Sequence, residues 1–366
     1  MEAPSVQYAR TPAGAVAWQE CGLPSAPPLI CTPPLVQHLE MMWERAAFWR
    51  PTLRFASRVR FIQYDKLGTG LSDPVDEPAD LDGRVEQLIA VLDAAGVERA
   101  TVMGFSEGGT TAMATAAWHP DRVAALVLVS AVPGTSDLHG VSAYGPVPPL
   151  DEIRRFWDEF SEKWGRPETL TLTHIAPSVL ADPAMRAWVP RYERAAASPA
   201  LIHRWVRSAL SLDATELLPE IDVPTLIVHQ FDDRIVPVAA GRYLADRISG
   251  AQYREFDGVD HFVWLSPDCD DYIDTIHEFL AGHGLATAEA TSGKSRSLWD
   301  PYDALTPGER RCVRLAQRGL PNAAIATALG LSVRTVENNL SRAFGKLGVR
   351  SRVELALLDE PTPPRR

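Results

Sequence analysis

Cysteine is scarce in this chain of 366 residues. Four are present, and they lie far apart: Cys21, Cys31, Cys269 and Cys312. No two form a C-x-x-C pair, and no histidine pattern typical of zinc ligands accompanies them. A disulfide framework and a zinc site are therefore not expected, and we predict no metal, no cofactor and a reducing compartment.

Long hydrophobic runs are also missing. The longest, 123–132, contains Ser130 and is too short to span a bilayer. The N-terminus Met1-Glu2-Ala3-Pro4 has neither the basic nor the apolar region of a signal peptide. We therefore expect a cytoplasmic protein without a membrane partner.

Basic residues are fewer than acidic ones, 36 against 47, so the net charge is −11. This balance argues against a protein that coats nucleic acid over its whole surface. The charge is uneven, however: 305–356 carries nine Lys or Arg against three Asp or Glu, a balance of +6, which leaves −17 for the other residues. A basic tail on an acidic body is expected when only the tail meets nucleic acid.

The chain is long enough for two domains, one of them large. Apolar strands alternate with helical patterns, which predicts an α/β fold with a mostly parallel sheet covered on both faces. The expected strands are 6–9, 15–19, 29–32, 59–63, a strand that runs into Gly104, 125–129, 223–229 and 252–256. The expected helices are 81–95, 110–118, 238–248 and 270–280. We predict domains at 1–285 and 301–366, joined by a small-residue linker at 286–300.

Between 134 and 215 the pattern predicts helices and no strand, and we interpret this part as a lid over the sheet. One helical stripe in it is aromatic: Ile153, Phe156, Trp157, Phe160 and Trp164, with Trp188 and Trp205 on later segments. The stripe could form a wall for an apolar ligand, but ordinary packing of the lid on the body is favoured.

A G-x-S-x-G pattern, Gly104-Phe105-Ser106-Glu107-Gly108, lies between the predicted strand and an Ala-rich helix. That context is typical of a nucleophile elbow, in which a sharp turn exposes the serine hydroxyl. A serine nucleophile needs a base and an orienting acid. Asp232-Asp233 and His261 both follow later strands, in the order expected for such sites. The alternative is that the two aspartates cap a helix and His261 only packs in a loop.

These stretches resemble the α/β-hydrolase family over about 6–280, and the lid matches least. In that family the acid lies in an Asp-x-x-Val-Pro context and the histidine follows a Gly-containing turn. The resemblance therefore implies a catalytic Ser106, Asp233 and His261, with Asp232 as the fallback acid. Segments 34–40, 65–70 and 105–109 look most like hydrolase domains fused to regulatory modules.

The expected oxyanion hole departs from the family pattern. Many members carry His-Gly after the strand that here ends at Thr32, whereas this chain has Pro33-Pro34, and proline has no N–H to donate. The resemblance then implies the amides of Leu35 and Glu107 as the two donors.

The tail reads as four short helices. Thr306, Pro307 and Glu309 form a capping-box start for the first helix, which is expected to end near Gly319. The other three are expected at 322–329, 333–347 and 352–358. Helices two and three, joined by the turn Gly330-Leu331-Ser332, form a helix-turn-helix pattern. In the third helix Val336, Leu340, Ala343 and Leu347 make the inner stripe.

The whole tail closely resembles the LuxR-type DNA-binding domain, through Ile325-Ala326, 329–332, 334–337 and 346–352. The resemblance implies double-stranded DNA as a partner. The implied DNA-binding residues are Arg334, Thr335, Glu337, Asn338, Ser341, Arg342 and Lys346. Asn339 replaces a common histidine, and Gly345 stands where a larger, often basic residue is usual.

From the sequence we predict a transcription regulator, expected to be a homodimer, that senses a small, largely apolar ester- or lactone-like ligand through a hydrolase-fold domain with a complete triad. One alternative is a serine hydrolase, an esterase or lactonase, with an accessory DNA-binding tail. Another is a hydrolase-fold receptor that does not catalyse.

Overall fold

The computed structural model describes residues 3–134, 137–266, 268–287, 305–317, 320–329, 331–347, 349 and 351–357. The chain divides into two compact units, 1–289 and 290–366, called the large unit and the tail below. Of the predicted linker, 286–300, only Ala286 and Thr287 fall within the described residues. No helix in the described ranges is long and apolar enough to cross a membrane.

The large unit is built on one eight-stranded sheet. Its strands are β1 (Gln7–Thr11), β2 (Gly14–Cys21), β3 (Pro28–Thr32), β4 (Arg60–Tyr64), β5 (Ala100–Phe105), β6 (Val123–Val129), β7 (Thr225–Gln230) and β8 (Gln252–Phe256). Their order is β1-β2-β4-β3-β5-β6-β7-β8. β2 pairs antiparallel with β1 and β4, and the remaining pairs are parallel. The expected α/β fold with a mostly parallel sheet is confirmed.

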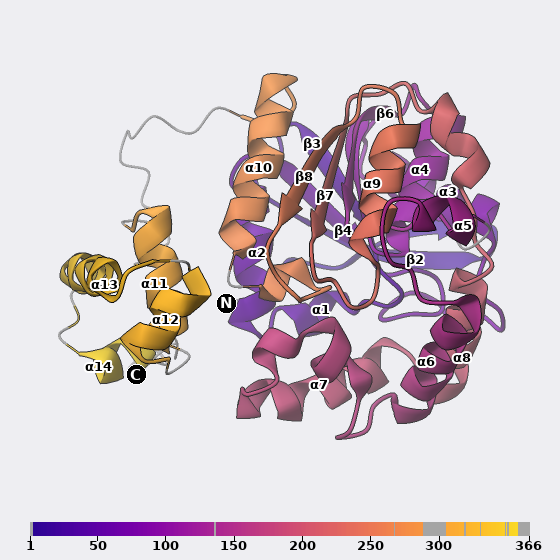
Figure 1. Cartoon of the computed structure of the whole chain (residues 1–366). Coiled ribbons are helices and arrows are strands. Elements are labelled where there is room, and N and C mark those ends of the chain that lie inside the picture. The colour runs from indigo at the N-terminus through magenta and orange to yellow at the C-terminus, as the bar shows by residue number, and fades with distance from the viewer. Residues whose placement is uncertain are drawn as a thin grey trace, which may run out of the picture. The chain divides into compact units, whose positions relative to one another are not determined.

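Helices cover both faces of this sheet (Figure 1). On one face lie α3 (Leu81–Ala94), α4 (Gly108–Trp118) and α9 (Val238–Arg247), whose Leu88, Met113 and Tyr243 share one core with strand residues. On the other lie α2 (Ala46–Ala56) and α10 (Cys269–Gly282), which pack a second core. The central strand β5 is buried along its whole length, as expected for a strand covered on both faces. The short α1 (Leu39–Met42) and η4 (Val263–Leu265) lie in loops at the carboxyl ends of strands.

The segment between β6 and β7, called the insertion, is helical. It contains α5 (Leu138–Ser142), α6 (Leu150–Lys163), η1 (Thr171–Ile175), η2 (Pro177–Val179), α7 (Pro183–Ala196), α8 (Pro199–Ala209) and η3 (Thr215–Glu220). An isolated bridge between Gly134 and Asp213 joins its two ends. Figure 1 shows α6, α7 and α8 grouped at one end of the sheet.

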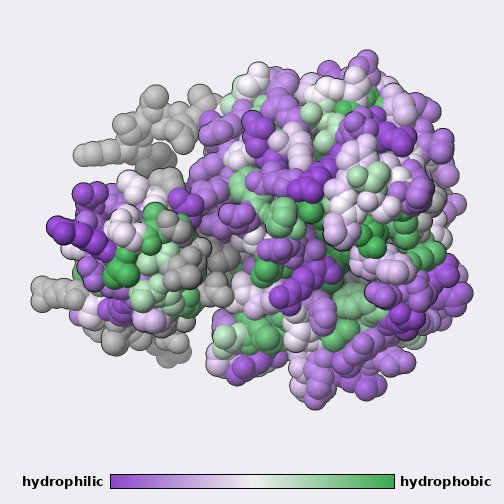
Figure 2. All heavy atoms as spheres, viewed as in Figure 1, coloured by the Kyte–Doolittle hydropathy of each residue, from purple (hydrophilic) through white to green (hydrophobic). Residues whose placement is uncertain are grey.

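The predicted aromatic stripe packs inside the insertion. Phe160 and Trp164 are buried in one cluster with Ile202 and Trp205 of α8. This arrangement agrees with the packing interpretation rather than with a ligand wall. On the face shown in Figure 2 the large unit is mainly hydrophilic, with hydrophobic residues in small groups.

The tail consists of α11 (Pro307–Gln317), α12 (Asn322–Leu329), α13 (Val333–Leu347) and α14 (Arg352–Leu357). The predicted capping box is present: Glu309 Oε2 accepts the Thr306 N–H at 2.9 Å, and Thr306 Oγ1 accepts the Glu309 N–H at 3.3 Å. Val336, Leu340 and Ala343 are buried in the tail core, and Leu347 packs against it.

The large unit holds Thr287, the last described residue before 305, by three hydrogen bonds. The Thr287 N–H and hydroxyl both donate to the Arg58 carbonyl, at 2.9 and 3.1 Å. Arg58 Nε donates in return to the Thr287 carbonyl at 3.1 Å. Thr287 is therefore attached to the loop that follows α2.

Candidate functional site

Ser106 lies at the turn between β5 and α4, in a strained backbone with a φ of 55°. Two glycines make this turn possible. A Cβ on Gly108 would lie 2.5 Å from the Pro33 carbonyl oxygen and 2.7 Å from that of Thr32, and one on Gly104 would lie 2.6 Å from Gly109 Cα. The elbow therefore packs against β3 and the start of α4 at distances that only glycine permits.

The structure joins Ser106, His261 and Asp233 in one hydrogen-bonded chain. His261 Nε2 lies 2.7 Å from Ser106 Oγ, and His261 Nδ1 lies 2.8 Å from Asp233 Oδ2. With the Nδ1 proton donated to the carboxylate, Nε2 is left to accept the serine proton, which is the arrangement a serine nucleophile requires. The fallback acid, Asp232, is exposed and takes no part in this hydrogen-bonded set of side chains.

Asp233 is fixed as an acceptor. Its Oδ1 takes the N–H groups of Ile235 and Val236 at 2.9 and 3.0 Å. Burial would raise the pKa of this carboxyl, but the charge and hydrogen bond of His261, with His229 and the Ile235 N–H, outweigh it and hold the pKa below its usual value. Asp233 is therefore ionised and can orient the imidazole.

The two amides expected to form the oxyanion hole are available. Within the described part of the chain, neither the Leu35 N–H nor the Glu107 N–H has a protein acceptor. Thr32 Oγ1 donates to the Gly108 carbonyl at 2.8 Å, which holds the end of β3, just before Pro33-Pro34, against the elbow. The Leu35 and Glu107 amides therefore stay the predicted donors to an oxyanion.

An apolar cavity adjoins the hydrogen-bonded chain. Phe105 and Phe262, the neighbours of Ser106 and His261, both line it, as does Pro34. Its other lining residues are Cys31, Gln37, Met42, Phe48, Pro51, Thr52, Phe55, Phe61, Gln63, Met103, Tyr192 and Trp264. The aromatic wall therefore comes mainly from α2, the strands and the loop after His261, with Tyr192 from the insertion.

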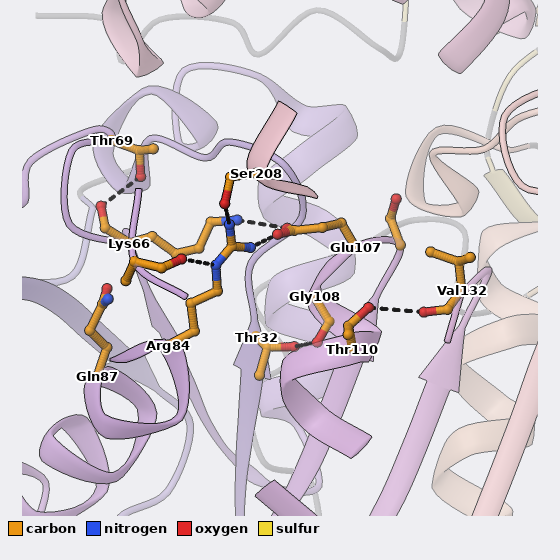
Figure 3. Close-up of polar contacts among 12 residues, drawn as sticks. Thr32, Lys66, Thr69, Arg84, Gln87, Glu107, Gly108, Thr110, Val132 and Ser208 are labelled. Carbon is orange, nitrogen blue, oxygen red and sulfur yellow. Dashed lines mark hydrogen bonds and ion pairs between the residues drawn. The ribbon is translucent and has the colours of Figure 1, made fainter. Parts of the chain in front are cut away.

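A buried charged cluster beside Ser106 was not found from the sequence. Lys66 and Arg84 both form ion pairs with Glu107, the residue after Ser106 (Figure 3). The three residues are 3%, 1% and 7% exposed. No motif in the sequence links these positions, because they come from three different elements.

The predicted DNA-binding residues share the outer face of α13. Arg334, Thr335, Glu337, Asn338, Ser341, Arg342 and Lys346 are all exposed. Lys346 forms an ion pair within the tail, because its Nζ lies 2.5 Å from Glu309 Oε2 in the capping box. Asn339 is half-buried and its amide reaches Cys312 Sγ at 3.6 Å. Arg334 and Arg342 are therefore the main positive charges on this face of α13.

The α/β-hydrolase fold model matches residues 27–267. The chain belongs to the α/β-hydrolase fold family. A second model, bacterial regulatory proteins of the luxR family, matches residues 303–358. The chain therefore combines a hydrolase domain with a LuxR-family helix-turn-helix domain. Among the described residues, no three His, Cys, Asp or Glu side chains group closely enough to hold a metal ion.

Curated relatives match the hydrolase domain. The chain is 32% identical over 245 residues to 2-hydroxymuconate semialdehyde hydrolase of Pseudomonas sp. strain CF600, covering 64% of this chain and 81% of that protein. It is 30% identical over 242 residues to 2-hydroxy-6-oxo-2,4-heptadienoate hydrolase of Pseudomonas putida strain F1, covering 64% and 83%. An esterase from Exiguobacterium antarcticum has the same fold, with a TM-score of 0.62, 20% identity and coverage of 76% of this chain and all of that one.

Proposed function

We propose that this protein is a DNA-binding transcription regulator whose hydrolase domain takes a small, largely apolar ester- or lactone-like ligand at Ser106. The observation that carries the proposal is the presence, in one chain, of a LuxR-family domain and a hydrogen-bonded Ser106–His261–Asp233. The proposed domains keep the predicted bounds of 1–285 and 301–366.

The chemistry proposed for Ser106 follows from the geometry. His261 Nε2 removes the hydroxyl proton while Asp233 stabilises the imidazolium, and the oxygen attacks a carbonyl carbon. The Leu35 and Glu107 amides donate hydrogen bonds to the negatively charged oxygen of the tetrahedral intermediate. The ester C–O bond then breaks, and the His261 imidazolium gives its proton to the departing alcohol oxygen, which leaves the acyl-enzyme. Water that gives its proton to His261 attacks the acyl carbon, and the carboxylic acid leaves as Ser106 Oγ takes the proton back. The cavity beside Phe105 and Phe262 offers an apolar surface to the ligand.

We expect the turnover to be slow. Pro33-Pro34 makes the loop before the Leu35 amide stiff, and loss of one oxyanion donor typically lowers the rate by ~10²–10³. A small misplacement of that loop would therefore be enough to reduce the rate.

Labelling with a fluorophosphonate probe tests the proposal. Purified full-length protein should gain one phosphonyl group at Ser106, measured by intact mass, and Ser106→Ala and His261→Ala should not. The same Ser106→Ala protein should bind duplex DNA as wild type does, because α13 is untouched. A wild type that stays as unlabelled as His261→Ala would make the hydrolase domain a non-catalytic receptor.

The second candidate is a serine hydrolase with an accessory DNA-binding tail, and the complete hydrogen-bonded triad is the observation in its favour. The two functions differ in rate and in coupling. An enzyme should turn over a short-chain p-nitrophenyl ester at about 10 per second, a typical value. A regulator should instead show slow turnover and a DNA affinity that changes when Ser106 is phosphonylated.

A further inference from the structure

The backbone around Ser106 is held at three successive residues by three different parts of the fold. The Ser106 N–H donates to the Val129 carbonyl of β6 at 3.0 Å. The Gly108 carbonyl accepts Thr32 Oγ1 of β3. Between them, the Glu107 carboxylate is held by side chains that follow β4 and that belong to α3.

The hold on Glu107 is ionic and buried. Lys66 Nζ lies 2.7 Å from Glu107 Oε2, and the Arg84 guanidinium pairs with Oε1. Arg84 is itself fixed, because its Nε donates to the Ala79 carbonyl at 2.9 Å. Burial, with the charge of Arg84, lowers the pKa of Lys66, whereas the Glu107 carboxylate at 2.7 Å favours its protonated form. Because a buried charge is tolerated only with its partners, the two basic side chains define the position of the Glu107 carboxylate closely.

Two side chains of α8, in the insertion, contact Lys66 and Arg84. The Trp205 ring of α8 lies 4.3 Å from Lys66 Nζ and 4.7 Å from Arg84 Cζ, measured to its centroid. Ser208 Oγ, one turn later, accepts Arg84 Nη2 at 2.9 Å (Figure 3). Trp205 is fully buried, so the two basic groups lie against an aromatic face that is shielded from bulk solvent.

We propose that the Glu107 side chain, held by Lys66 and Arg84 under Trp205, is a positioning residue for its own peptide N–H, the second oxyanion donor. A strained elbow keeps its shape only when its surroundings fix it. The cluster supplies that fixation at the one residue whose amide must point at the oxyanion. Because Trp205 and Ser208 belong to the insertion, α8 contributes to holding the donor in place.

This inference rests on the proposed function, since it concerns the oxyanion that Ser106 would generate. It assigns no bond-making step to the three side chains. Removing an ion-pair partner should therefore lower the reactivity of Ser106 while the midpoint of the pH profile of labelling stays the same.

The test measures the second-order rate of fluorophosphonate labelling at Ser106, across pH, in full-length protein. Lys66→Met should slow labelling roughly tenfold or more, less than or equal to the ~10²–10³ loss of a whole donor. The midpoint of the pH profile should stay within 0.3 of wild type (about twofold in proton concentration). Lys66→Arg, which keeps the charge, should restore most of the rate, a rescue that packing alone would not give.

Glu107→Gln is the direct variant and should slow labelling at least as much. Its matched control is Glu20→Gln, which breaks the Arg60–Glu20 pair between β4 and β2 and should leave the rate within about twofold of wild type (under 0.5 kcal/mol). If Glu107→Gln does not fold, Trp205→Phe replaces it, because it keeps the ring packing and weakens the cation contact; it should slow labelling severalfold.

The outcomes separate the two proposals. Wild type that is not labelled overturns the proposed catalytic function and this inference with it. Wild type that is labelled, with Lys66→Met and Trp205→Phe labelled at the same rate while folded, overturns this inference alone. A shifted pH midpoint in Lys66→Met would also overturn it, since the cluster would then act through His261.

Discussion

At the residue scale, the elbow could be predicted because each of its parts has a local signature. Gly104 and Gly108 flank Ser106 in the pattern, and the structure gives the reason: a side chain at either position meets backbone within 2.7 Å. The pairing of Lys66 and Arg84 with Glu107 has no such signature. Ion pairs between distant elements depend on how those elements pack. The spacing of residues along the sequence does not predict that packing.

Two glycines with opposite surroundings give a residue-scale prediction. Gly108→Ala should destabilise the large unit by about 1–3 kcal/mol through forced displacement of the Thr32–Pro33 backbone, and should slow Ser106 labelling. Gly345→Ala in α13 is the matched control. Nothing lies within 4 Å of the added Cβ, so the helix should gain about 1 kcal/mol.

Both effects are measurable in the full chain. Urea unfolding of the large unit reports the first. Amide hydrogen exchange in 333–347 reports the second, as roughly fivefold slower exchange for ~1 kcal/mol. An unchanged midpoint in Gly108→Ala would show that the elbow can shift away from β3.

At the element scale, helices with clear caps and periodic stripes could be predicted, and α2 could not. α13 was expected at 333–347 and is observed there, with a buried stripe that includes Val336 and Leu340. α2 contains Pro51, which ordinarily breaks a helix interior. Its buried Phe55 packs on the sheet and α10, and its buried Phe48 packs against Trp188 and Tyr192 of α7. Tertiary contacts on two sides therefore override the local preference.

The same interface predicts a pH effect. His277 of α10 is 2% exposed, and its Nε2 lies 3.3 Å from the Phe55 carbonyl of α2. Burial, with the charge of Arg58, lowers the pKa of His277 to about 4, from 6.5. The folded state therefore keeps this imidazole neutral, while the unfolded chain takes up a proton below 6.5.

Because the folded pKa lies below the unfolded one, this stability is present above pH 6.5 and is lost as the pH falls toward 4. The loss should reach at most ~3 kcal/mol, since each pKa unit is worth about 1.36 kcal/mol. His277→Gln should lose less stability than wild type between pH 7 and 4.5. Urea midpoints at the two pH values measure this; equal losses in the two proteins would contradict it.

At the scale of the whole molecule, the charge asymmetry of the sequence predicted two domains with different partners. The acidic hydrolase domain and the basic LuxR-family domain are matched by separate family models. Ser106, Asp233 and His261 come from distant parts of the hydrolase domain, and each could be named in advance because it lies in a sequence motif. The position of the cavity beside Phe105 required the structure.

The exposed face of α13 predicts how the whole protein binds DNA. Arg334 and Arg342 should neutralise phosphates, so affinity should fall steeply as salt rises. Arg342→Ala should weaken binding to all duplexes similarly and flatten the salt slope by about one unit. Asn338→Ala should instead change the preference between sequences. Fluorescence anisotropy at several salt concentrations measures both, and an affinity that is flat with salt would contradict the prediction.

Lys346 provides the internal comparison for that experiment. Its pairing with Glu309 in the capping box makes it a weaker phosphate ligand than Arg342, so Lys346→Ala should change the salt slope less. It should destabilise the α11–α13 packing instead. A salt slope that falls equally in both variants would show that Lys346 leaves Glu309 when DNA binds.

The last prediction concerns assembly. A single module of this size buries too little surface for high specificity, so binding should require a homodimer and an operator with two related half-sites. We expect the predicted helix 352–358, observed as α14 at Arg352–Leu357, to make the contact between tails. Sedimentation of the full chain with operator DNA should give two chains per duplex, and footprinting should protect both half-sites about one helical turn apart. A single protected half-site with one bound chain would mean that the hydrolase domain, not a second tail, supplies the missing affinity.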